Sequence, residues 1–170
     1  MAKKNYEKLN ANLISNLKKK IEELKATEEK FRLAFENAKD AIFWADPKTG
    51  MITNCNKAAE SLLEKKRNEI IGYPQTKLHP SEKAAFYAKM FKKHIKQKKA
   101  VDDEAEVITK SAKIKPVHIT ASVTLIGGKP IIQGIFRDIT ERKKIQQEKF
   151  QKQKEKYKRE LEKLKSKLKK

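Results

Sequence analysis

Hydrophobic positions recur with two different periods along the chain, and the changes of period mark its elements. Over residues 5–36 apolar side chains return every three or four positions without Gly or Pro, which predicts one long amphipathic helix. Ile at heptad position a with Leu at d favours a parallel two-stranded coiled coil, while a helix lying on a sheet would show the same pattern. The first half could pair between chains while the second half docks on the domain. The residues of the expected dimer helix are Ile14, Leu17, Ile21, Leu24 and Phe31.

Five later segments have strand character. The first is apolar on both faces, which is typical of a strand covered on both sides, and a turn containing Pro47 and Gly50 leads into the second. The last two are joined by Gly127-Gly128, a strong hairpin signal. The expected strands are residues 41–45, 51–54, 101–109, 114–126 and 129–138.

Helical segments separate and flank these strands. Asn56 is a candidate N-cap for a short helix, and a longer helix is expected to begin at His79-Pro80 and to reach Ile95. From Thr140 onward the chain is again helical, with a weak apolar seam. Two strands, connecting helices, three strands and two flanking amphipathic helices predict an α+β domain with mainly antiparallel pairing.

The last strand passes directly into the last helix. Asp138, with Thr140 and Glu141 after it, offers candidate N-cap side chains at this junction, and we expect Asp138 to pair with Arg142 four residues on. A strand that continues into an exposed helix is suited to passing a signal out of a domain.

Composition and charge limit the classes of protein and the cellular compartments that fit this sequence. The 170 residues carry a net charge of +20, almost all of it from Lys, and the charge is densest in residues 139–170. A basic helical protein that binds nucleic acid or an anionic surface is therefore an alternative, although interspersed acids and scarce Arg favour a solvated helical face. The single Cys55 excludes a disulfide within the chain, and neither a membrane span nor a signal peptide is recognisable. We expect a cytoplasmic protein.

An ordered set of motifs over about residues 28–145 resembles a PAS domain. The matching stretches are Glu28 to Ile42, the turn around Asp46 and Gly50, Asn56 to Leu63, Glu69-Ile70-Ile71-Gly72, Leu78-His79-Pro80 and Gly134 to Lys144. The resemblance implies a five-stranded antiparallel sheet with helices packed on one face around a small cavity, a dimerising N-terminal helix and a C-terminal signalling helix. The expected parts are helix 1–36, PAS core 37–139 and signalling helix 140–170.

The resemblance also implies the cavity lining. Alternation counted back from Asp138 turns one side of each of the last two strands inward, together with one or two residues of the long helix. The expected lining is Phe86, Met90, Val117, Ile119, Ala121, Ile132, Gly134 and Phe136. This lining is apolar and has no evident charged anchor, so we expect these side chains to fill the core without a ligand, and a small apolar ligand is the alternative.

Catalytic and cofactor chemistry find little support. The three His and one Cys lack metal-ligand spacing, so neither a metal site nor an enzyme is expected. Cys55 does not occupy the position of the reactive cysteine in flavin-binding relatives, and it is expected to be a structural residue. His79 is expected to be a cap, His118 to lie on a polar face and His94 to be exposed at a helix end, so flavin and haem are not expected, although a haem-binding sensor remains a further alternative.

The sequence therefore predicts a sensor or relay segment of a signal-transduction protein such as a histidine kinase of a two-component system. We expect a homodimer whose helices pair in either a parallel or an antiparallel orientation. It is expected to pass conformational change through Asp138, Ile139 and Thr140 to an effector domain outside this chain. Nucleic acid is not expected as a partner.

Overall fold

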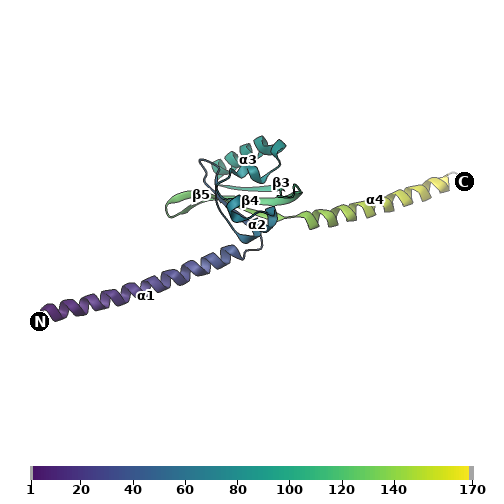
Figure 1. Ribbon diagram of the computed structural model, residues 1–170. Coiled ribbons are helices and arrows are strands. Elements are labelled where there is room, and N and C mark those ends of the chain that lie inside the picture. Colours follow the sequence, from purple (N-terminus) through teal and green to yellow (C-terminus); the bar gives the residue numbers. More distant parts are fainter. Residues whose placement is uncertain (1, 169–170) are drawn as a thin grey trace.

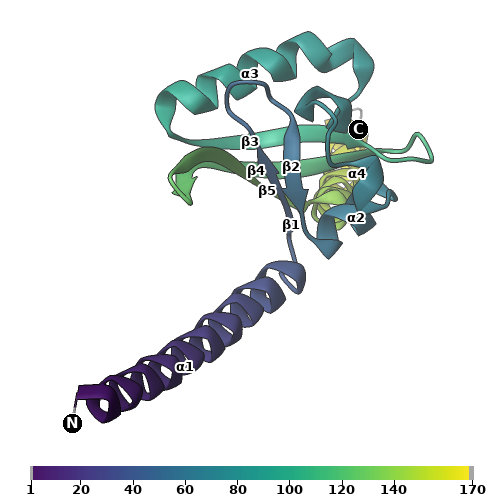
Figure 2. The ribbon, with the colours of Figure 1, turned by 60° about the vertical axis from the view of Figure 1, so that its left-hand side comes forward.

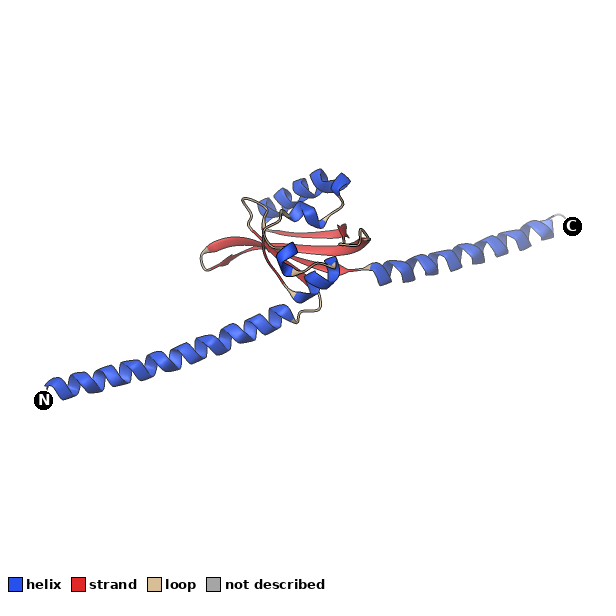
Figure 3. Cartoon of the chain, viewed as in Figure 1, coloured by secondary structure: helices blue, strands red, loops and turns tan. Residues whose placement is uncertain are grey.

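The computed structural model describes residues 2–168, with side chains described for residues 9–10, 12–98 and 104–166. A central domain carries two long helices, α1 (Ala2–Glu36) and α4 (Thr140–Leu168), which extend away from it toward opposite ends of the molecule (Figures 1 and 3). The arrangement follows from composition, because the apolar residues needed for a core lie between these helices.

The domain contains one five-stranded sheet in the order β2-β1-β5-β4-β3, and each pair of neighbours is antiparallel. This confirms the predicted α+β class and the strand count. The last strand, β5, lies in the centre between β1 and β4, where its alternating apolar residues are buried. The strands are β1 (Ala41–Ala45), β2 (Ile52–Cys55), β3 (Lys99–Ile108), β4 (Ile114–Ile126) and β5 (Lys129–Asp138).

The helical connections lie against one face of the sheet (Figure 2). They are α2 (Lys57–Leu63), α3 (Ala84–Gln97) and three 3₁₀ turns, Arg67–Glu69, Gln75–Leu78 and Ser81–Lys83. The long helix begins later than the Pro80 signal predicts, because the residues after that proline first form a 3₁₀ turn. The main core packs helical residues such as Leu63 and Tyr87 on the inward residues Phe43, Val117 and Phe136.

The last turn of α1 contacts the domain. The Phe35 ring packs at a tilt against Trp44 with centroids 5.0 Å apart, whereas Phe31 is 70% exposed. Of the second half of the helix, which was expected to dock on the domain, Phe35 does so and Phe31 does not, because the helix is held at its C-terminal end and its earlier turns project outward. The apolar seam of α1, including Ile14, Leu17, Ile21 and Leu24, is exposed in the single chain.

A fully buried side chain, Asn56, joins four segments of the domain. Its Oδ1 accepts hydrogen bonds from the backbone N–H groups of Ile42 (2.9 Å) and Ala59 (3.0 Å), which confirms Asn56 as the N-cap of α2. Its Nδ2 donates to the backbone C=O groups of Phe35 (3.1 Å) and Asp40 (3.0 Å). One amide therefore fixes the end of α1, the following loop, the start of β1 and the start of α2.

Replacing Asn56 with Ala is expected to lower the free energy of unfolding by about 3 kcal/mol, because buried backbone groups lose their partners. Urea denaturation measures this loss. Asn68→Ala is the matched control, since Asn68 is exposed. Equal losses in the two variants would contradict the role given to Asn56.

Candidate functional site

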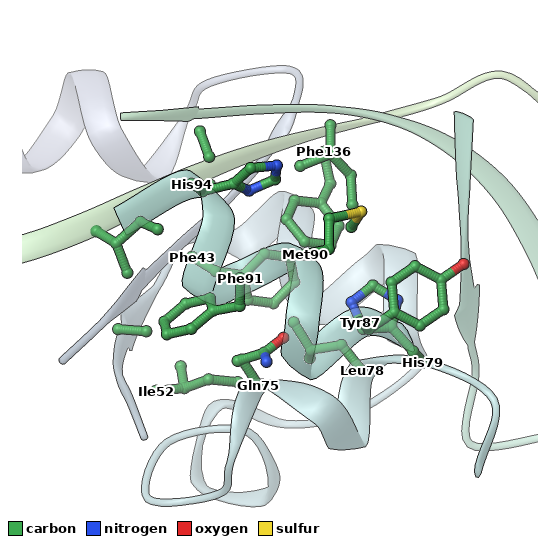
Figure 4. Close-up of a pocket in the computed structure, with 15 residues that line it drawn as sticks. Phe43, Ile52, Gln75, Leu78, His79, Tyr87, Met90, Phe91, His94 and Phe136 are labelled. Atoms are coloured by element: carbon green, nitrogen blue, oxygen red, sulfur yellow. The ribbon is translucent and has the colours of Figure 1, made fainter. Parts of the chain in front are cut away.

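A cavity of about 50 Å³ lies between the inner face of the sheet and α3 (Figure 4). Most of its wall is apolar, and the side chains of the lining that carry a polar group are Gln75, His79, Tyr87 and His94. The full lining is Phe43, Ala45, Ile52, Gln75, Leu78, His79, Tyr87, Met90, Phe91, His94, Ile119, Ala121, Ile132, Gly134 and Phe136.

Six of the eight sequence-predicted lining residues are at the cavity: Met90, Ile119, Ala121, Ile132, Gly134 and Phe136. Phe86 is not, and it is 61% exposed, because the inward stripe of α3 runs through Tyr87 and Phe91 instead. Val117 is fully buried but lies outside the lining. It pairs with Asp138 at the end of the sheet, where it belongs to the core beside α2.

Sequence reasoning missed the part of the wall that comes from the first two strands and the 3₁₀ turn. Phe43 alternates with Trp44 on β1, so its inward position could have been found once β1 was paired with β5. Gln75 and Leu78 come from the turn Gln75–Leu78, whose sequence carries no periodic signal.

His79 is a buried wall residue and not a simple helix cap. Its Nδ1–H donates to the backbone C=O of Glu106 at 2.6 Å, and its ring stacks on Tyr87 with centroids 3.6 Å apart. The Tyr87 hydroxyl accepts the Glu106 N–H at 2.8 Å, so both side chains hold β3 against the cavity wall. Burial lowers the pKa of His79 to about 4, so its ring is neutral at pH 7.

His94 also lies inside, which corrects the expectation of an exposed helix-end residue. It follows Tyr87 by seven positions and Phe91 by three, so all three share the inward stripe of α3. Figure 4 shows its ring directed toward the cavity between the helix and the sheet.

Gly134 leaves room for an aromatic ring. A Cβ at this position would lie 2.8 Å from a ring carbon of Phe136. That ring packs edge-on against Phe43, with centroids 4.9 Å apart. The close approach at Gly134 is therefore made by a neighbouring side chain of the same strand.

The β5–α4 junction is organised by Asp138. Its Oδ1 accepts hydrogen bonds from the Thr140 backbone N–H (2.9 Å) and hydroxyl (2.5 Å), so Asp138 caps the start of α4. Its Oδ2 lies 3.8 Å from Lys115 Nζ on the neighbouring strand. The predicted pairing with Arg142 is not formed, because the capping geometry turns the carboxylate toward β4.

A second set of contacts joins the end of α1 to the same strand. Arg137 Nε and Nη2 both donate to the Asp40 carboxylate, at 2.7–3.2 Å. The Glu36 carboxylate accepts from Arg67 Nη1 at 2.7 Å and from the Lys57 backbone N–H at 3.2 Å. Arg137 and Asp138 are adjacent, so the exit of α1 and the start of α4 are both linked to the end of β5.

Other candidate chemistry is structural. Cys55 is fully buried, and burial raises the pKa of its thiol to about 11, which makes it unreactive at pH 7. Among the side chains described, at residues 9–10, 12–98 and 104–166, no group of three or more His, Cys, Asp or Glu could hold a metal ion. The helices in the described part of the chain include none long and apolar enough to cross a membrane.

Comparison with known proteins gives one concordant result. Residues 39–141 match the family model described as PAS domain. The chain is 30% identical over 123 residues to the methyl sulfide methyltransferase-associated sensor of Methanosarcina acetivorans; the match covers 72% of this chain and 12% of that protein. The chain thus spans about an eighth of the length of this curated relative.

Solved PAS domains share the fold. The PAS domain of an HTR-like protein from Haloarcula marismortui superposes with a TM-score of 0.63 at 19% identity, covering 72% of this chain and 99% of that one. A domain of a sensory box sensor histidine kinase/response regulator from Geobacter sulfurreducens gives a TM-score of 0.57 at 24% identity, covering 68% and 96%.

His79 is expected to make stability depend on pH. Its folded pKa of about 4 lies below the ordinary value of 6.5, so between these values the unfolded chain binds the proton and the folded chain does not. Stability should therefore fall by about 3 kcal/mol as pH drops from 6.5 to 4. Urea unfolding across this range measures it.

His79→Gln should remove that part of the slope, since Gln does not titrate. His118→Gln, on the opposite face of β4, is the matched variant that also has one histidine fewer. The assignment fails if His79→Gln and the unmodified chain lose stability in parallel between pH 6.5 and 5.

Proposed function

The chain belongs to the PAS domain family, and from this premise we propose that it is a sensor or relay module that passes conformational change to an effector domain through α4. Its relatives include a protein named as a sensor and PAS domains of histidine kinases, which supports a signalling role. The chain's own function is binding and transmission, without catalysis.

One observation carries the proposal: a single central strand contacts both the cavity and the start of α4. Ile132, Gly134 and Phe136 on β5 line the cavity, and Asp138, two residues after Phe136, caps α4. A molecule entering the cavity must displace or order side chains of this strand. The displacement reaches the Asp138 carboxylate without crossing a loop.

The path has two outputs. Asp138 and Thr140 set the direction in which α4 leaves the domain, and the Arg137 contact with Asp40 transmits the same movement to the end of α1. Arg142 has no part in holding the junction. Both helices then change orientation together, which is what a two-helix connection to neighbouring domains requires.

The size of the cavity favours a small ligand. Pockets for drug-sized ligands usually measure about 300–1,000 Å³, and this one measures about 50 Å³. A neutral molecule of a few heavy atoms fits the apolar wall and could meet Gln75 or His94. Haem or flavin would need a cavity several times larger, so we propose that neither is bound.

Homodimerisation through α1 completes the proposal. Ile14, Leu17, Ile21 and Leu24 form one exposed apolar seam with the a and d pattern of a two-stranded coiled coil. A helix with this much exposed aliphatic surface is stabilised when a second copy covers it.

The role of the junction is tested by filling the cavity with a larger side chain in place of a ligand. In a fusion of the chain to the dimerisation and catalytic parts of a histidine kinase, Ala121→Leu should change autophosphorylation at least threefold. Asp138→Ala should abolish this response, because α4 loses its cap and its connection to β5, while circular dichroism stays that of the folded domain.

Glu141→Ala is the control, a carboxylate truncated in the same turn that makes no contact with β5. It should leave the response to Ala121→Leu within twofold. A full response in the Asp138→Ala background would refute the proposed path.

The proposed dimer is tested by substitutions in the apolar seam of α1. Leu17→Gln with Leu24→Gln should convert the chain from dimer to monomer at micromolar concentration, because two d positions lose apolar burial. Sedimentation equilibrium measures the mass. Ala26→Gln, on the outer face of α1, should leave the dimer intact, and a monomeric unmodified chain would contradict the assignment.

A further inference from the structure

Helix α3 has a second face that the cavity does not use. Between Ala84 and Lys98 the sequence contains five lysines and no acidic residue. All five lysines are exposed, and Phe86 is exposed near the start of the same face. The lysines, which we call the α3 lysine face, are Lys89, Lys92, Lys93, Lys96 and Lys98.

The carboxylates that the structure describes do not neutralise the charge of the α3 lysine face. Elsewhere lysines of the domain pair with carboxylates, as Lys83 does with Glu106 at 2.6 Å and Lys110 with Glu69 at 2.7 Å. Among the side chains that the structure describes, no carboxylate lies within ion-pair distance of the α3 lysine face. Its positive field therefore points into solvent.

An exposed aliphatic hairpin lies beside the end of this face. At the tip of the β4–β5 hairpin Leu125 is 70% and Ile126 is 44% exposed, next to Lys129. The Val123 backbone N–H donates to the C=O of Lys98 at 2.9 Å, which joins the root of the hairpin to the end of α3. In Figure 2 the hairpin tip and the end of α3 lie at the same end of the domain.

We propose that the α3 lysine face and the hairpin tip form a docking surface for an anionic membrane. Lysine ammonium groups attract phosphate headgroups, while two adjacent aliphatic side chains on a rigid two-glycine turn enter the boundary of the acyl region. The complementarity is both electrostatic and apolar, as interfacial binding requires.

The surface fits a bilayer better than a nucleic acid. Base and phosphate readers rely on Arg forks and aromatic platforms, and this surface has neither Arg nor an aromatic residue at the hairpin. Helices α1 and α4 are also rich in lysine, but glutamates are interspersed along both. The tail is therefore a weaker candidate for an anionic surface than α3.

Docking here would act on the cavity from outside. The inner side of α3 contributes Tyr87, Met90 and Phe91 to the cavity wall, so a membrane that holds the outer side also fixes that wall. The proposal does not depend on the sensor function, because it concerns a surface that makes no contact with the junction.

The test is co-sedimentation of the full chain with vesicles of phosphatidylcholine alone or with 30% phosphatidylglycerol, at 100 mM salt. Binding is expected only to the anionic vesicles. Combined Lys92→Glu, Lys93→Glu and Lys96→Glu should raise the apparent Kd at least tenfold. Combined Leu125→Ser and Ile126→Ser should raise it at least threefold with the charge unchanged.

The control carries the same charge change on α4, as Lys149→Glu, Lys152→Glu and Lys156→Glu, and should alter the Kd less than threefold. Thermal melting shows that each variant is folded. Absence of binding to anionic vesicles, or equal losses in the α3 and α4 variants, would overturn the proposal. Binding of a fluorescent DNA duplex without binding of vesicles would overturn it in favour of a nucleic-acid surface.

Discussion

The buried amide of Asn56 is the contact on which the arrangement of this domain depends. The start of β1, the N-terminus of α2 and the end of α1 meet just beyond the last β1–β2 ladder pair, Phe43 with Cys55, and their backbone groups would be buried without partners. A carboxamide has both an acceptor and two donors, so one side chain satisfies all of them. A carboxylate or an apolar residue of similar size could not do so.

Much of the fold could be predicted from sequence because its elements have local signals. Strand periodicity, the Gly127-Gly128 turn and the Asn56 cap are local signals, and each corresponds to an observed element. Element ends were less predictable. The helix after Pro80 begins with a 3₁₀ turn, and Phe31 stays exposed, because both depend on how distant segments meet and not on the local period.

The residues of the candidate site could be predicted only where inward and outward side chains alternate along a strand from a residue of known position. Counting back from Asp138 placed Ile132 and Phe136 at the cavity, since a strand turns every second residue inward. The rotation of α3 could not be obtained in this way. Its inward stripe is decided by packing of Tyr87 on His79, which turns Phe86 out and brings His94 in.

The strengths of the contacts around β5 suit a switch. Arg137 is 68% exposed in its pair with Asp40, so solvent screens this ion pair, which orients the segments without locking them. The two hydrogen bonds that Thr140 donates to Asp138 contribute about 1 kcal/mol each.

Coupling free energies between sites are typically about 1–3 kcal/mol. A ligand of a few heavy atoms can supply such a difference, because small ligands gain at most about 1.5 kcal/mol per atom. The Asn56 contacts are buried and therefore stronger than the exposed contacts of the junction.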